Sequence, residues 1–435
     1  MLTIVLLDIL LVIVLLILAV PLPFCFGGAL LFMSVFGEVS MKSMMLWGFS
    51  QMLNPILLAS PLFILSGTLM GGSGIAKRLL DFVDVFIGHI KGGLGVVCCF
   101  TCAVIGAISG SGFTGVAATG PILIPRMVEQ GYPRGYATAL LTVSSILGLL
   151  IPPSAIMILY GWVTGTSILA CFMSTAGPGL LITVNLSILN LYLVRRYNMP
   201  LDIDSIETVR QKRKELGSRT INALPALLMP VIILGGIYGG IFTATEAAAV
   251  SAAYAIPVGF WIYKGFKKGD FFKLCREAAT SSGALMTMIL FCLILSQTYV
   301  ILKVPQALVE FMFSITHNKF ILLIMVNIFL FTVGMIVNDG TGMILCAPML
   351  LPLVQELGIT PIHFAAIMGV NLAMGGVTPP YASILYLGMR VGKCSFNEIL
   401  KPTIIFLVFG YLPVILLTTY WAPLSLFIPS LFGLN

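Results

Sequence analysis

Apolar stretches long enough to cross a membrane recur along this chain, separated by short segments that hold most of the charged residues. A spanning helix needs about 20 mostly apolar residues. The pattern predicts continuous spans near 4–20, 22–36, 47–70, 168–194, 221–240, 243–263, 280–302 and 403–420. We therefore expect an all-α integral membrane protein.

Two other apolar segments are interrupted in the middle by small polar residues. Segment 93–127 is cut at Ser109–Gly112, and segment 320–354 is cut at Asn338–Gly340. Each half is short for a span. Irregular backbone at membrane depth is tolerated only where it is buried in protein or lines a water-filled cavity. The pattern predicts two re-entrant helical hairpins with buried tips.

Each hairpin has a broken crossing after it and an amphipathic stretch before it. The crossings 137–165 and 364–388 each contain a Pro-Pro pair, which an uninterrupted helix does not accommodate. The stretches 75–90 and 304–316 have polar residues along an apolar face. They are predicted to lie at the membrane interface as arms.

The interrupted region occurs twice in the chain: residues 333–392 repeat the pattern of residues 106–165 at a constant separation. Thr114, Gly115, Pro121, Pro125, Glu129, Gly131, Gly148, Pro152, Pro153, Gly161 and Gly165 recur as Thr341, Gly342, Pro348, Pro352, Glu356, Gly358, Gly375, Pro379, Pro380, Gly388 and Gly392. Matched helix breaks in two halves indicate a transporter whose site lies between its repeats.

An odd number of crossings in each half makes the two repeats face opposite ways across the membrane. We expect five crossings in each half, with both termini outside. The predicted divisions are a first inverted repeat at 1–194, a cytoplasmic connector at 195–220 and a second inverted repeat at 221–435.

Composition and charge placement support this topology. Hydrophobic residues make up 59% of the chain and charged residues 9%, whereas charged residues are about a quarter of a soluble domain. The net charge of +7 comes from loops between the spans. Placing those loops in the cytoplasm leaves only Lys42, Lys303 and Lys319 outside, as the positive-inside rule requires. The expected partner of this charge is the lipid bilayer, not nucleic acid.

The helix breaks carry the candidate chemistry. Two tips and two Pro-Pro bends would meet near the midplane if the repeats pack about a pseudo-twofold axis. Helix N-termini there offer N–H groups to an anion, while freed carbonyls and C-terminal ends can bind Na⁺. The breaks therefore predict an anion site beside a cation site.

Several separated motifs resemble one known family. They are Gly106–Gly112 continuing to Ile124–Pro125, Leu150–Ser154, Ile241–Ala249 and Leu372–Pro380. They resemble the large membrane subunit of TRAP transporters, the DctM type. The resemblance implies an elevator-type, Na⁺-driven importer of an organic acid, such as a dicarboxylate or a sialic acid, in the bacterial inner membrane. It also implies two partners: a separate, unfused small four-helix membrane subunit (DctQ-like) and a periplasmic substrate-binding protein (DctP-like).

The same resemblance implies the site residues. It assigns a first sodium site to Ser109, Gly110, Ser111, Gly112, Gly148 and Pro152. It assigns a second sodium site to Asn338, Asp339, Gly340, Thr341, Gly375, Thr378 and Pro379. Substrate contacts are expected at Ser111, Thr114, Pro153, Ser154, Thr341 and Pro380. Na⁺ is the coupling ion, and no organic cofactor is expected.

Alternatives remain open at this stage. Asp339 either caps the second limb of its hairpin or ligates Na⁺. Glu246 is interpreted as stabilising a helix N-terminus, and Arg126 as setting orientation. A stand-alone Na⁺/dicarboxylate symporter and a gated channel are the other functional classes. The three histidines lie at loop edges or in interfacial stretches, away from Ser111, so no enzyme activity is expected.

Overall fold

A computed structural model describes residues 2–37, 39–87, 90–197, 199, 216–380 and 382–434, and it is helical without strands in these ranges. The first half contains α1 Leu2–Ile17, α2 Leu22–Phe36, α3 Met41–Met52, η1 Pro55–Leu58, α4 Ala59–Ser73, α5 Ile75–Ile87, α6 Gly93–Ser109, α7 Gly112–Glu129, α8 Arg134–Ser145, η2 Ile146–Leu149, α9 Ala155–Thr164 and α10 Ile168–Arg196.

The second half contains α12 Leu216–Tyr238, α13 Ala244–Pro257, η3 Val258–Ile262, α14 Lys268–Ile301, α15 Val304–Ile315, α16 Lys319–Ile336, α17 Asp339–Glu356, α18 Pro361–Gly375, α19 Ser383–Gly392, α20 Phe396–Phe406, η4 Leu407–Tyr411, α21 Leu412–Tyr420 and α22 Pro423–Leu431. Among these ranges, 7 helical segments are long and apolar enough to cross a membrane. The expectation of an all-α integral membrane protein is confirmed.

The two interrupted segments form pairs of helices with short breaks. The α6–α7 break lies at Gly110 and Ser111, and the α16–α17 break at Val337 and Asn338. Both second limbs, α7 and α17, are 18 residues long and hold two prolines in their interiors. In each pair the break therefore lies where the polar tip is predicted.

The broken crossings share the same construction. Helix α8 ends at Ser145 and is followed by η2 and a short non-helical segment at 150–154, after which α9 begins. Helix α18 ends at Gly375, and α19 begins at Ser383. The peptide bonds Pro152–Pro153 and Pro379–Pro380 are both cis.

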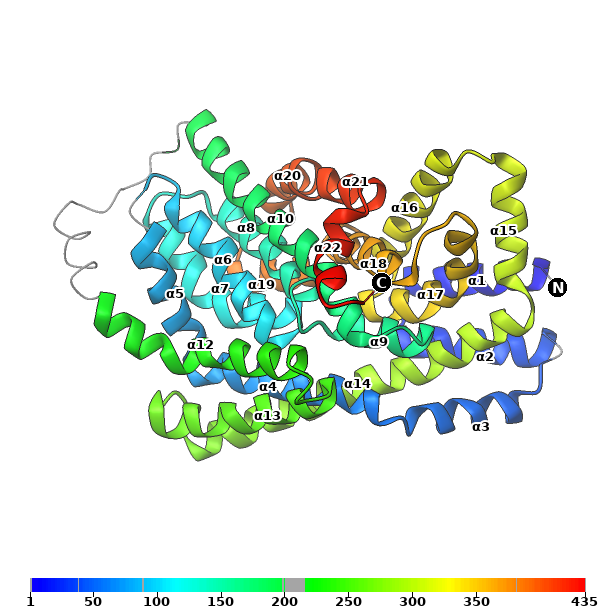
Figure 1. The fold of residues 1–435 in the computed structure, drawn as a ribbon, viewed down its shortest axis with the longest axis horizontal. Coiled ribbons are helices and arrows are strands. Elements are labelled where there is room, and N and C mark those ends of the chain that lie inside the picture. Colours follow the sequence, from blue (N-terminus) through cyan, green and yellow to red (C-terminus); the bar gives the residue numbers. More distant parts are fainter. Residues whose placement is uncertain are drawn as a thin grey trace.

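The halves exchange partners at the centre of the molecule. Helix α9 packs against α17, and α19 packs against α7, so each broken crossing meets the hairpin of the other half. Figure 1 shows α4, α13 and α14 along one long side of the molecule, with the hairpins and broken crossings stacked on them. Helix α4 packs against both α13 and α14. We call α4, α13 and α14 the frame.

Three predicted spans have different bounds. The stretch 47–70 is two helical segments, because the Asn54 side chain accepts a hydrogen bond from the Ile56 N–H at 3.0 Å and starts a new helix at Pro55. The stretch 280–302 begins earlier, at Lys268, where Asp270 accepts the backbone N–H of Lys267 at 3.2 Å. The stretch 403–420 begins at Phe396 and is followed by the unpredicted helix α22.

The amphipathic stretches are helices, and the connector is described only at its edges. The arms predicted at 75–90 and 304–316 correspond to α5 and α15. Helix α10 extends to Arg196 and α12 begins at Leu216. Most of the connector predicted at 195–220 lies outside the described residues.

Candidate functional site

A cavity of about 670 Å³ lies between the frame and the helix breaks. Both hairpin tips reach it, together with the start of α9 and one face each of α4 and α14. Its polar or charged lining residues are Ser60, Thr68, Ser109, Ser111, Thr114, Glu277, Ser281, Asn338 and Asp339. Its apolar lining includes Phe63, Ile64, Phe113, Leu159 and Leu285. We call this space the central cavity.

The first tip turns sharply because Gly110 adopts the left-handed conformation, with φ 61°. A Cβ atom at Gly110 would lie 2.9 Å from the carbonyl oxygen of Pro153, so no larger residue fits. The Gly110 carbonyl accepts the Ala155 N–H at 3.4 Å. The tip of the first hairpin is therefore joined directly to the start of α9.

A close backbone contact brings the first bend to the same tip. A Cβ atom on Gly106 would lie 2.3 Å from the Gly148 Cα, and one on Gly148 would lie 3.0 Å from the Ser111 carbonyl oxygen. The structure thus gathers Ser109 to Gly112 with Gly148, the residues that the resemblance assigns to a first sodium site. Pro152 is buried in the same bend.

The end of α7 that faces the central cavity is uncapped. Ser111 is extended at the N-cap position, and its side chain makes no capping hydrogen bond. The first N–H groups of a helix have no partner within the helix. Ser111, Phe113 and Thr114 all line the central cavity. This helix end therefore offers N–H and hydroxyl donors to a ligand.

The second tip has the opposite chemistry. The Asn338 side chain caps α17 by accepting the Gly340 N–H at 3.0 Å. Asp339 is 8% exposed and places a carboxylate in the first turn of α17. Both residues line the central cavity. Capping is thus assigned to Asn338, and the carboxylate of Asp339 makes this tip unfavourable for an anion.

Thr341 also lies at the second tip, and its environment indicates that it contacts a ligand. Its hydroxyl is buried and has no hydrogen-bond partner among the described residues. Buried hydroxyls without a partner are uncommon, because the lost hydration is not replaced. Its counterpart in the repeat, Thr114, is partly exposed to the central cavity.

The bend of the second half lies beside its hairpin but not in the central cavity. A Cβ atom on Gly375 would lie 2.4 Å from the Gly334 backbone, which repeats the contact between Gly106 and Gly148. The Thr378 hydroxyl donates to the Met374 carbonyl at 2.9 Å. Pro379 is half-buried in the same bend.

Only Ser111 and Thr114 of the six predicted substrate contacts line the central cavity, and the other four, Pro153, Ser154, Thr341 and Pro380, do not. Pro380 lines a separate, largely apolar cavity of about 910 Å³ beside α1 and α2. Asn338 and Leu285 line this cavity as well as the central one, so the second tip forms part of the wall between them. Ser154 is buried, and its hydroxyl donates to the Leu149 carbonyl, which closes the first bend.

The lining residues on the frame were not predicted. Ser60, Gly67 and Thr68 form one face of α4, and Glu277 and Ser281 form one face of α14. Glu277 precedes the span predicted at 280–302. A polar and small-residue stripe within the apolar α4 is a signal that could have identified that face.

Charge at the far end of α7 is used in an ion pair. Arg126 lies 2.7 Å from Asp84 and 3.7 Å from Asp81, both on α5. Asp84 is 2% exposed. From the sequence, Arg126 is interpreted only as setting the orientation of the chain in the membrane. The structure shows that it also joins the arm helix α5 to the first hairpin.

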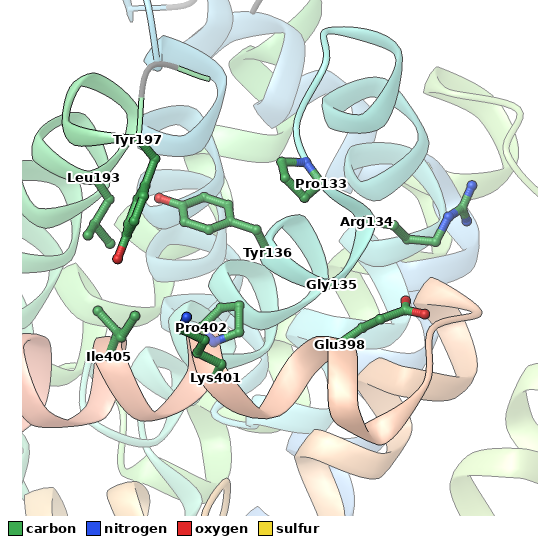
Figure 2. Close-up of a pocket in the computed structure, with 10 residues that line it drawn as sticks. All are labelled: Pro133, Arg134, Gly135, Tyr136, Leu193, Tyr197, Glu398, Lys401, Pro402 and Ile405. Atoms are coloured by element: carbon green, nitrogen blue, oxygen red, sulfur yellow. The ribbon is translucent and has the colours of Figure 1, made fainter. Parts of the chain in front are cut away.

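A third cavity, of about 400 Å³, lies where α8, α10 and α20 meet. Figure 2 shows Arg134 and Glu398 on one side of it and Tyr197 on the other, with Lys401 beside Pro402 on α20. The Arg134 side chain donates to the Gly392 carbonyl at 3.1 Å. None of the predicted site residues lines this cavity.

Membrane-spanning helices with paired breaks around a central cavity define the chain as a membrane transporter permease. A family model described as "Tripartite ATP-independent periplasmic transporter, DctM component" matches residues 9–423. The chain belongs to this family. This confirms the prediction, made from the sequence motifs, that it resembles the large membrane subunit of TRAP transporters.

Similar proteins extend this result. The C4-dicarboxylate TRAP transporter large permease protein DctM of Pseudomonas aeruginosa is 33% identical, over 94% of each chain. The sialic acid TRAP transporter large permease protein SiaM of Vibrio cholerae is 31% identical, over 87% of each. The isethionate TRAP transporter permease protein DctMQ of Oleidesulfovibrio alaskensis is 33% identical over 85% of this chain, which spans 58% of that protein.

The fold is also similar to a solved structure. The YdaH transporter of Alcanivorax borkumensis superposes with a TM-score of 0.59, covering 88% of this chain and 89% of that one. The sequences are 16% identical, so this likeness concerns the fold alone.

Proposed function

We propose that this permease uses a Na⁺ gradient to import an organic acid through the central cavity. The observation that carries the proposal is the difference between the two tips that meet there. The first tip offers uncapped N–H groups and the Ser111 hydroxyl, whereas the second carries the Asp339 carboxylate. An anion and a cation can therefore bind in one space at different helix ends.

The donor atoms at the breaks suit Na⁺. Carbonyl and hydroxyl oxygens meet at both tips, and the described residues hold no cluster of three or more His, Cys, Asp or Glu side chains. The unpartnered Thr341 hydroxyl is the observation that favours a cation at the second tip. Asn338, Asp339 and Thr341 would hold that ion, and Ser109 to Gly112 with Gly148 would hold another at the first tip.

The packing suits a mobile core that slides against the frame. The hairpins and broken crossings pack on one another across the two halves, whereas α4 packs mainly on α13 and α14. Inverted repeats of this kind alternate access by movement of one bundle against another. We assign the core to the hairpins and broken crossings, and the arms to α5 and α15.

The partners follow from the family. TRAP large permeases are components of tripartite transporters, so we propose a separate small membrane subunit and a periplasmic substrate-binding protein as partners. The location is the bacterial inner membrane. The relatives named for C4-dicarboxylates and sialic acid suggest a carboxylate substrate.

The test is uptake of a labelled organic acid into proteoliposomes that contain the full chain, with and without both partner proteins. Uptake is expected only with both partners and an inward Na⁺ gradient. Equal uptake with K⁺ in place of Na⁺ contradicts the sodium proposal. Saturable uptake by the chain alone contradicts the tripartite proposal and favours a stand-alone symporter.

A further inference from the structure

We propose that Glu277 of α14 selects the substrate, favouring an organic acid that has one carboxylate and a hydroxyl or ammonium group at its other end. This inference rests on the function proposed above. The named relatives transport C4-dicarboxylates, sialic acid or isethionate according to their names, so membership of the family does not decide the charge of the substrate.

The charged groups around the central cavity are both acidic. Asp339 lies at the second tip and Glu277 lies on the frame, and no Lys, Arg or His is found among the described residues that line the space. Glu277 is exposed, and Ser281 lies one helical turn farther along the same face of α14. The frame therefore presents the Glu277 carboxylate, a hydrogen-bond acceptor, and the Ser281 hydroxyl to a substrate in the central cavity.

One end of the substrate is fixed by the difference between the tips. Its carboxylate is attracted to the uncapped end of α7, where Ser111 makes no capping bond. It is repelled from the second tip by Asp339. The rest of the substrate then extends toward the frame and Glu277.

A buried hydroxyl on the frame also points to a polar ligand. Ser60 of α4 is 0% exposed, lines the central cavity, and has no hydrogen-bond partner among the residues described. A hydroxyl of the substrate would satisfy it. Together with Thr68 and Ser281, it places hydroxyl groups on the frame side of the cavity, among apolar residues such as Phe63 and Leu285.

On the frame side a second carboxylate would meet Glu277 and no basic side chain among the described lining residues. Two like charges about 10 Å apart, at the effective dielectric constant of a protein surface, reduce affinity about tenfold. A hydroxyl avoids this repulsion, and an ammonium group reverses it. Glu277 thus discriminates by the charge at the far end of the substrate.

The experiment compares acids that differ only at that end. Dissociation constants are measured for the purified full chain in NaCl and in KCl, with succinate against 4-hydroxybutyrate and D-glucarate against D-gluconate. In Na⁺ the hydroxy acid of at least one pair is expected to bind about tenfold more tightly than its dicarboxylate. In Glu277→Gln this ratio is expected to fall to about one.

Glu310→Gln is the matched control, because Glu310 is an exposed acid on α15 outside the central cavity. It should keep the wild-type ratio. Glu277→Ala serves as a second variant, and Na⁺-dependent thermal stabilisation reports whether each variant is folded. A dicarboxylate that binds as tightly as its hydroxy acid, or a ratio unchanged in both Glu277 variants, overturns the inference. Absence of Na⁺-dependent binding for all four acids contradicts the proposed function instead.

Discussion

At the scale of single residues, glycine is required where two backbones touch. Gly106 meets Gly148 in the first half, and Gly334 meets Gly375 in the second. In each pair one limb of a hairpin lies directly against a bend, with no room for a side chain. The repeat retains Gly148 as Gly375 because this contact positions the bend.

Replacing Gly106 with alanine tests the contact. The added methyl group would lie 2.3 Å from the Gly148 Cα, and a packed backbone cannot move as a side chain can, so we expect a loss of about 1–3 kcal/mol of stability. Gly235→Ala is the matched control, since Gly235 lies inside α12 with nothing within 4 Å. Thermal unfolding of the purified protein measures both. A Gly106→Ala protein as stable as wild type would show that the bend is free to shift.

Thr341 is the residue-scale test of the cation site. Thr341→Ala removes a buried oxygen that has no protein partner. We expect Na⁺ affinity to fall about tenfold, since a hydrogen bond or ligand contact to a charged group contributes about 1.5–3 kcal/mol. Na⁺ titration of thermal unfolding measures this change.

The control for that titration is Thr298→Ala. The buried Thr298 hydroxyl donates to the Ile294 carbonyl of its own helix, at 2.8 Å. Its loss should leave Na⁺ affinity unchanged. Equal Na⁺ affinities in all three proteins would assign Thr341 a purely structural role.

At the scale of elements, the arm helix α5 connects the first hairpin to the neighbouring helices. Asp81 and Asp84 contact Arg126 of α7. Arg219 of α12 donates to the Asp81 carbonyl at 3.5 Å, and the Arg78 guanidinium lies 5.4 Å from the centre of the Tyr263 ring. A short amphipathic helix is therefore held by charge at a point where the apolar spans end.

The two carboxylates of α5 should contribute unequally. Arg126→Gln removes the 2.7 Å ion pair to the buried Asp84. We expect a loss of about 2–3 kcal/mol, near the lower end of the range for broken buried pairs, because Arg126 is partly exposed. Asp81→Asn should cost at most about 0.5 kcal/mol, because that pair is longer and both of its side chains are partly exposed. Chemical or thermal unfolding of the two variants compares them, and similar losses would contradict the assignment.

The breaks between elements could be predicted because their causes are local. Gly110, Asn338 and the Pro-Pro pairs dictate interruptions whatever surrounds them. The break at Asn54 has the same kind of local cause, yet the apolar residues around it favoured one span. The place of Glu277 in the cavity could not be predicted, because it depends on how α14 packs against the tips.

At the scale of the whole molecule, the frame and the proposed core meet along glycines of α4. A Cβ atom on Gly67 would lie 2.9 Å from the Ser109 Cβ and 3.0 Å from the Thr114 hydroxyl oxygen. One turn along, a Cβ atom on Gly71 would lie 3.7 Å from the Ala118 Cβ, which is an ordinary contact. The tip of the first hairpin is therefore closest to the frame at Gly67.

Movement of the core can be tested at these two positions. Gly67→Ala is expected to slow uptake several-fold in proteoliposomes with both partners, because the methyl group obstructs the hairpin, while Na⁺ affinity changes little. Gly71→Ala should transport at the wild-type rate. Equal uptake rates in the two variants would contradict sliding at this contact.

The acid at the second tip also makes the proposed core sensitive to voltage. With Na⁺ bound beside an ionised Asp339 the tip is neutral, whereas an Asp339 that stays ionised after the ion leaves carries one negative charge through the membrane as the core moves. A full crossing changes the free energy by about 2.3 kcal/mol for each 100 mV. In the proposed mechanism, a negative cell interior therefore pushes the empty, negatively charged core outward, and the membrane potential resets the transporter for the next substrate.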